Sequence, residues 1–470
     1  MTSHTASFRI VGTLGMLLLS ASAIAQKEKE VNQLELGLQL LSRGETRGGG
    51  MAADPDNPSS DDVSNFILDR ERLVVGYRRE GGKEHKSIGL EAKTTIQHIG
   101  VWGQEGSGSV GIYEGWAKLK AKLGNGNVDG NGNVDGNQGG MLFAQLGRLA
   151  LKYDDERIIG PNDWSVAALT HDALLLGYEG YGHKLHVILA YNQNVRVLEE
   201  PGSYYENGSR PYKTMRNLWY HYDVPKFPLG VSVLWMNIGM QSGTKNGKDN
   251  YAPHTEYQQL LGGYLKFSPK HWQIEGSYYR QMGKQEEGMD IKAWMASGKA
   301  CWQPGGPLSF EAGYDYLSGD DSFAVPRPGQ MGITRHTEIR GFSPVYGSHH
   351  KFYGAMDFFY LSSYVNGFSP GLQNLYGAVN FQPLKDLTIT GRYHYMAITA
   401  KLTDIDKTLG HVIEAEGEYR LSRDISLSAG FSFMTGTETM ERLKRASNSG
   451  SLRWGWLSLN VTPSLFISKW

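Results

Sequence analysis

Near its carboxyl end the chain reads Ile425-Ser-Leu-Ser-Ala-Gly-Phe-Ser-Phe433. Apolar residues alternate there with three serines and one glycine. Successive side chains of a β-strand point to opposite faces of a sheet, so this stretch predicts a strand with one apolar and one polar face. Such segments are typical of strands that face lipid on one side and a polar interior on the other.

The same alternation recurs along most of the chain. Between Lys184 and Asn192 the apolar set is Leu185, Val187, Leu189 and Tyr191, and we expect these four to face outward. Clusters rich in Gly, Pro, Asp and Ser separate the segments, and short turns alternate with longer loops. The pattern predicts an all-β fold, a single antiparallel transmembrane β-barrel of about 18 strands, with 16 also compatible.

The amino terminus predicts a signal peptide over residues 1–25, which leaves 26–470 as the barrel domain. Arg9 precedes an apolar run from Ile10 to Leu19, and Ala23-Ile24-Ala25 has the small residues of a cleavage site. That run is too short for a membrane-spanning helix, and no later run reaches about 18 apolar residues. The sequence therefore predicts export from the cytoplasm without helical anchoring.

Composition excludes several classes of protein. The chain has 47 basic and 48 acidic residues, so it has no basic excess for binding nucleic acid. Its single cysteine, Cys301, cannot form an intramolecular disulfide. The 26 tyrosines and 11 tryptophans suit the two interfaces of a bilayer, where an apolar ring and a polar tip are both accommodated.

We find no motif that predicts catalysis. The chain has no H-E-x-x-H, C-x-x-C or P-loop. Gly367-Phe-Ser-Pro-Gly371 matches the pattern of a nucleophile elbow, but Pro370 lacks the N–H that the residue after the serine must supply. We therefore predict no enzyme activity, catalytic residue, cofactor or metal site.

The polar faces of the predicted strands carry many charges. Basic residues on these faces are Arg70, Arg72, Arg78, Lys93, Lys118, Lys120 and Arg392, and acidic residues are Glu91, Glu114 and Asp315. In a wide barrel this face lines the lumen, where charge selects the ions and anionic solutes that pass. The same residues could instead form cross-strand ion pairs that only fill the lumen, and the sequence leaves both interpretations open.

One stretch resembles the alginate export family of outer-membrane barrels. It contains Gly147-Arg148, then Tyr153-Asp-Asp-Glu-Arg157-Ile-Ile-Gly160, then Asp163-Trp164 and Asp172-Ala173. The chain has Leu149 and His171 where the family has Gln and Phe. The resemblance implies an 18-stranded barrel that exports an acidic polysaccharide, and it implies that Arg148 and Arg157 line the lumen.

These observations lead to one hypothesis and two alternatives. The hypothesis is a channel in the outer membrane of a Gram-negative bacterium that passes an acidic polysaccharide or another anionic or carbohydrate solute. Its partners would be outer-membrane lipids, the solute, and a periplasmic secretion partner that the sequence does not identify. The alternatives are an outer-membrane enzyme that acts on lipid or glycan, and a soluble secreted β-protein, which alternation alone also permits.

Overall fold

The computed structural model describes residues 32–49, 63–80, 88–106, 108–123, 139–193, 205, 212–243, 253–286, 288–321, 338–359, 369–444 and 451–470. The predicted signal peptide lies outside the described residues. The strands are β1 (Asn32–Gly48), β2 (Ser64–Arg79), β3 (Ile88–Val101), β4 (Ser109–Leu123), β5 (Gly140–Leu149), β6 (His171–Gly180), β7 (His183–Tyr191), β8 (Thr214–Asp223), β9 (Leu229–Ser242), β10 (His254–Phe267), β11 (Trp272–Glu286), β12 (Met289–Trp302), β13 (Leu308–Leu317), β14 (Glu338–Ile339), β15 (Leu372–Leu384), β16 (Leu387–Ala397), β17 (Thr408–Arg420), β18 (Ile425–Gly436), β19 (Leu452–Val461) and β20 (Ser464–Lys469). Two short helices, η3 (His349–Lys351) and α2 (Glu438–Lys444), lie between strands, and no helix in the described ranges is long and apolar enough to cross a membrane.

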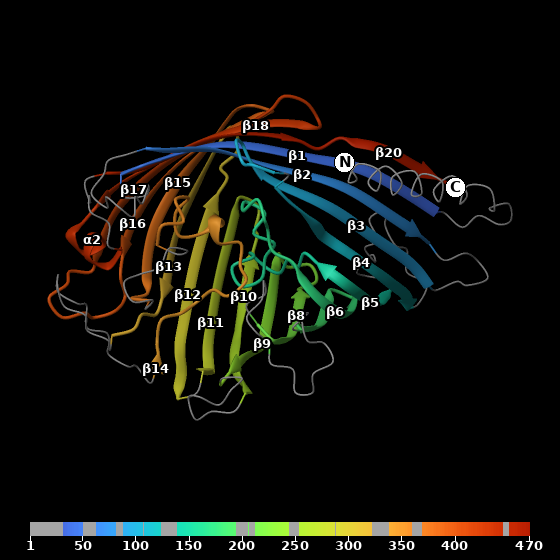
Figure 1. Ribbon diagram of the computed structural model, residues 1–470, viewed down its shortest axis with the longest axis horizontal. Helices are drawn as coiled ribbons and strands as arrows, with labels where there is room; N and C mark the ends of the chain where they lie inside the picture. The colour runs from blue at the N-terminus through green and yellow to red at the C-terminus, as the bar shows by residue number, and fades with distance from the viewer. Residues whose placement is uncertain are drawn as a thin grey trace.

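The strands form one closed antiparallel barrel (Figure 1). Each long strand pairs with its neighbours in sequence, and β1 closes the ring by pairing with β19 and β20 as well as β2. β19 and β20 are one strand interrupted near Pro463, whose nitrogen cannot donate a hydrogen bond. β14 is a two-residue parallel addition to β12. The barrel therefore has eighteen strands around its wall, which confirms the predicted fold and the larger predicted count.

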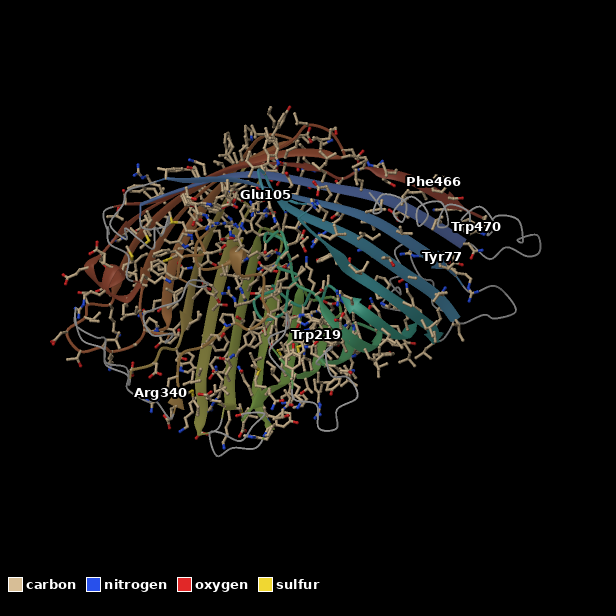
Figure 2. All side chains as sticks on the ribbon, in the orientation of Figure 1. Tyr77, Glu105, Trp219, Arg340, Phe466 and Trp470 are labelled. Atoms are coloured by element: carbon tan, nitrogen blue, oxygen red, sulfur yellow. The ribbon has the colours of Figure 1, made fainter. Side chains whose placement is uncertain are left out.

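The two ends of the barrel differ. At the end that we call the turn end, most connections between strands are short, the connection 124–139 from β4 to β5 being an exception, and the N–H of Asn32 donates to the carbonyl of Trp470 at 2.8 Å. Tyr77, Phe466 and Trp470 lie there (Figure 2). One two-residue connection is Tyr181-Gly182, where both residues have positive φ, 55° and 81°. This backbone matches the twist of the flanking strands, and glycine adopts it without strain. Most of the longer connections lie at the opposite end, the loop end.

The outward face of the wall is apolar, as the alternation predicts. On β7, Leu185, Leu189 and Tyr191 are 40%, 43% and 47% exposed, whereas the intervening Ile188 is fully buried. Two bands of aromatic rings border this face. Trp294 stacks on Tyr316 near the loop end of β12, and Trp302 stacks on Trp272 near its turn end, with centroids 4.7 and 6.0 Å apart.

The two aromatic bands have the spacing that a bilayer needs. Eight residues separate Trp294 from Trp302, which is about 26 Å along an extended strand. A strand tilt of roughly 40° reduces this to about 20 Å along the barrel axis, close to the ~25 Å apolar band of outer-membrane barrels. The wall therefore presents a lipid-compatible belt between two aromatic girdles.

Candidate functional site: the lumen and its two inner loops

Two connections of the loop end lie inside the barrel rather than above it. We call residues 150–170 the first inner loop and residues 341–359, which follow β14 and Arg340, the second inner loop. In the first, Asp163 accepts hydrogen bonds from Arg70 and Arg72 of β2. Asp154 of the same loop accepts a hydrogen bond from the indole N–H of Trp219 on β8, at 3.1 Å. One loop thus contacts distant parts of the inner wall and crosses the lumen (Figures 1 and 2).

The two inner loops are joined to each other by backbone hydrogen bonds. The N–H of Gly160 donates to the carbonyl of Tyr346 at 2.9 Å, and the N–H of Ser348 donates to the carbonyl of Glu156 at 2.8 Å. The approach is close enough to require glycine, because a Cβ at position 160 would lie 2.4 Å from the hydroxyl oxygen of Ser348. The loops therefore form one body within the lumen.

Arg157 connects this body to the wall. Its side chain is 4% exposed, and its Nη1 lies 3.1 Å from Oδ1 of Asp315 on β13, which is 2% exposed. The same guanidinium donates to the hydroxyl of Tyr353 at 2.9 Å and to Asp155 at 3.2 Å. Burial opposes the charged form, but Asp315, Tyr353 and Asp155 outweigh it and hold the pKa of Arg157 well above its ordinary value.

The polar network continues from Asp315 along the wall. Asn374 of β15 donates to Asp315 at 2.9 Å, and its carbonyl oxygen lies 2.8 Å from Nδ1 of His394 on β16. Nε2 of His394 lies 3.4 Å from Glu414 of β17, which accepts the N–H of Ala355 in the second inner loop at 2.6 Å. Arg392 is 3.5 Å from the same carboxylate. Four strands and both loops thus share one buried network.

Near β1 and β19, an aromatic stack holds the loops. The indole of Trp164 in the first inner loop lies parallel to the His350 ring of the second, with centroids 3.9 Å apart. The guanidinium of Arg43 on β1 lies 3.9 Å from the Trp164 centroid. Asp357 accepts from His350 at 2.9 Å. Stacking and cation–π attraction therefore fasten both loops to β1.

Ion pairs run along the inner face of β2, β3 and β4. Arg78 lies 3.1 Å from Glu91, which also pairs with Lys120, and Lys93 lies 2.6 Å from Glu114. The ammonium of Lys118 lies over the ring of Phe143, 3.7 Å from its centroid. Cross-strand ion pairs, one of the two interpretations that the sequence left open, are therefore present.

Space remains beside these ion pairs. One cavity of about 490 Å³ is lined by β1–β4 and both inner loops, and its cations are Arg72, Lys93, Lys152 and Lys351. A second cavity, of about 560 Å³, extends toward the turn end past Arg78. Both are lined by Val74 and Lys93, so they adjoin. A smaller cavity of about 60 Å³ lies beside Arg157 and Arg392 on the other side of the loops.

The structure brings ten of the eleven candidate residues to the inside of the barrel. They are Arg70, Arg72, Arg78, Glu91, Lys93, Glu114, Lys118, Arg157, Asp315 and Arg392. The exception is Arg148, whose predicted place in the lumen is wrong. Arg148 follows the outward phase of Leu142 and Leu146, which are 46% and 64% exposed, and its guanidinium pairs with Asp172 of β6 at 2.7 and 2.9 Å.

Sequence reasoning missed several residues of the site. Arg43 and Glu45 form a buried pair at 2.9 Å on β1, and their period-two spacing was a usable signal. Asp163, Glu156 and Lys351 belong to the inner loops, where no periodicity reports the direction of a side chain. Of the nucleophile-elbow pattern that the sequence analysis rejected, the first two residues, Gly367 and Phe368, lie outside the described residues.

The barrel resembles solved outer-membrane proteins. OccAB4 of Acinetobacter baumannii matches with a TM-score of 0.58 and 10% identity, over 93% of this chain and 99% of that one. OpdO of Pseudomonas aeruginosa matches with 0.57 and 12%, over 92% and 98%. OprD of the same organism matches with 0.55 and 12%, over 92% and 94%. Identity this low speaks to the fold alone, and no curated protein sequence matches the chain.

The family model described as "Alginate export" matches residues 132–411, which is more than half of the chain. This range contains the first inner loop, Asp315 and the second inner loop. The family match and the closed barrel both indicate an outer-membrane location and an 18-stranded β-barrel fold. The chain thus belongs to the alginate export family, as an outer-membrane β-barrel channel of a Gram-negative bacterium.

Proposed function

We propose that this channel conducts anionic carbohydrate, either an acidic polysaccharide or smaller carboxylate-bearing sugars, along the inner face of β1–β4. The family's description, alginate export, is consistent with an acidic polysaccharide. The solute would pass through the two adjoining cavities. The buried network around Arg157 would occupy the other side of the lumen.

The observation that carries this proposal is a repeated charge arrangement. Along the two cavities three carboxylates are each shared by two cations: Glu91 by Arg78 and Lys120, Glu156 by Lys152 and Lys351, and Asp163 by Arg70 and Arg72. Each set of two cations and one carboxylate therefore keeps one unit of positive charge that its own carboxylate does not neutralise. A passing carboxylate can be attracted to each group in turn.

Lys152 and Lys351 are the most accessible of these cations. Their side chains are 66% and 52% exposed, and both ammonium groups bind the same oxygen of Glu156, at 2.8 and 2.7 Å. An ammonium has three N–H donors, so each lysine keeps donors for a solute. Glu156 is 5% exposed and accepts a further hydrogen bond from Ser348 at 2.7 Å, so it stays in place as an anchor.

Single-channel recording in planar bilayers tests the proposal. We expect anion selectivity in a salt gradient, and block of the current by oligouronates at concentrations where neutral oligosaccharides of equal length have no effect. Lys152→Gln combined with Lys351→Gln should weaken the block, whereas Arg423→Gln, which removes an 89%-exposed cation from a turn, should not. Cation selectivity, or equal block by neutral sugars, would contradict the proposal.

A further inference from the structure

The outward face of the barrel carries most of its charged side chains at one end. Charged side chains that follow the outward phase of the strands gather toward the loop end, and they are Asp69, Glu71, Arg148, Asp172, Arg216, Arg280, Asp290, Lys292 and Arg453. The turn end of the same face carries aromatic residues such as Trp272 and Trp302, with Arg79 as an exception. The two leaflets of the membrane therefore meet different surfaces of this protein.

Three cations of this face lie together on β11, β12 and β14. Arg280 is the register partner of Trp294, and Lys292 lies two residues from Trp294 on the same face. Both side chains are exposed. Lys292 forms an ion pair with Glu338, which also accepts from Arg340 at 2.8 and 3.1 Å. We call Arg280, Lys292 and Arg340 the basic patch.

The acids of the patch leave one of its cations free. Glu338 is shared by two of the three cations, and the other acid of the same face is Asp290, the register partner of Glu338. Arg280 has no ion-pair partner within the described ranges, and it has five N–H donors in a geometry that matches phosphate. Figure 2 shows Arg340 far from Trp470, which marks the turn end.

The depth of the patch matches a lipid headgroup. Tyr278, Trp294 and Tyr316 stack in sequence, with centroids 6.1 and 4.7 Å apart, and form the girdle at the loop end. Such girdles lie at the boundary between acyl chains and headgroups. Lys292 is two residues beyond Trp294, about 7 Å along the strand toward the loop end. The basic patch therefore lies where headgroup phosphates are found.

We propose that the basic patch binds a phosphate of the bisphosphorylated glycolipid of the outer leaflet, lipid A. A phosphate monoester carries between one and two negative charges and three acceptor oxygens, whereas the diester of an ordinary phospholipid carries one charge. A cluster of three cations is matched better by the monoester. Charge-assisted hydrogen bonds from Arg280 and Arg340, with Lys292 between them along the sheet, would hold it. This binding site is independent of the solute that the lumen conducts.

Native mass spectrometry of the full-length protein in detergent measures the binding of each lipid. We titrate lipid A with both phosphates, the same lipid without phosphates, and phosphatidylglycerol. The variant is Arg280→Gln combined with Lys292→Gln, and the matched control is Arg453→Gln, an exposed outward cation on β19 away from the patch. Each cation near a phosphate surface changes the affinity by roughly fivefold, so the double variant should bind lipid A about 25-fold more weakly.

The control should bind like the wild type, and the wild type should prefer bisphosphorylated lipid A over both other lipids. The proposal is overturned by undiminished binding in the double variant, by an equal loss in Arg453→Gln, or by equal binding of phosphatidylglycerol. Heat-modifiable migration in gels checks that the variants fold. If the double variant fails this check, two measurements still test the proposal. The wild-type protein must prefer bisphosphorylated lipid A among the three lipids, and the charge-conserving variant Lys292→Arg must retain that binding.

Discussion

The ion pair between Arg157 and Asp315 should control how firmly the inner loops stay seated in the lumen. Both side chains are almost completely buried, at 4% and 2% exposure, and their atoms approach to 3.1 Å. Arg157→Gln would leave Asp315 as a buried charge with only the amide of Asn374 as a neutral donor. Removing one partner of a buried ion pair typically costs about 3–5 kcal/mol.

That magnitude predicts a large change in the position of the loops. A loss of about 3 kcal/mol raises the ratio of unseated to seated loops more than 100-fold. Because the loops occupy the lumen between the cavities, we expect Arg157→Gln to show larger single-channel conductance and faster proteolysis of the first inner loop. Planar bilayer recording and limited proteolysis of the purified barrel measure the two effects.

A double-mutant cycle supplies the control. Asp315→Asn alone should also unseat the loops, because Arg157 then remains buried with only Asp155 as its acidic partner. The combination of Arg157→Gln with Asp315→Asn leaves neither charge unpaired, so its conductance should lie closer to that of the wild type than either single variant. Equal conductance and equal proteolysis in all four proteins would refute the assignment of this pair as the anchor of the loops.

Three further predictions concern separate parts of the molecule. Trp164→Ala removes the ring between Arg43 and His350, and we expect it to weaken loop seating by roughly 3 kcal/mol, measured by limited proteolysis. Burial lowers the pKa of His349 to about 4 from 6.5, so the unfolded second inner loop takes up a proton before the folded one does. The stability of the second inner loop should therefore be complete above pH 6.5 and should fall progressively as the pH falls from 6.5 to about 4. We expect the conductance to rise as the pH is lowered from 7 to 4, and to rise less in His349→Gln. Leu218→Arg places a charge on the lipid face midway along β8 and should destabilise the barrel by about 2–4 kcal/mol in folding titrations with lipid vesicles, whereas Leu218→Ala should cost less.

The family resemblance implied that two arginines line the lumen, and the structure places one of the two inside the barrel. Arg157 is the centre of the buried network, as the resemblance implied for a lumen residue. Arg148 belongs to the same motif but points outward, because the two arginines lie on either side of the point where the chain leaves the wall. Arg148 is on β5, where alternation decides its face, while Arg157 is in the inner loop, where contacts decide it.

Local periodicity alone was enough for the barrel. An alternating chain exposes an apolar face on every strand. A closed barrel turns all of these faces toward lipid and pairs the backbone groups of every strand. Leu185, Leu189 and Tyr191 could therefore be assigned to the outward face from the sequence. The same count assigned Arg70, Arg72 and Lys93 to the inside. Only the tertiary structure decided that residues 150–170 and 341–359 enter the lumen, because their places depend on partners such as Arg157 with Asp315 and Trp164 with His350, which are more than 150 residues apart in the chain. Long-range contacts of this kind leave no periodic signal, since each is made by one side chain whose direction the neighbouring residues do not set.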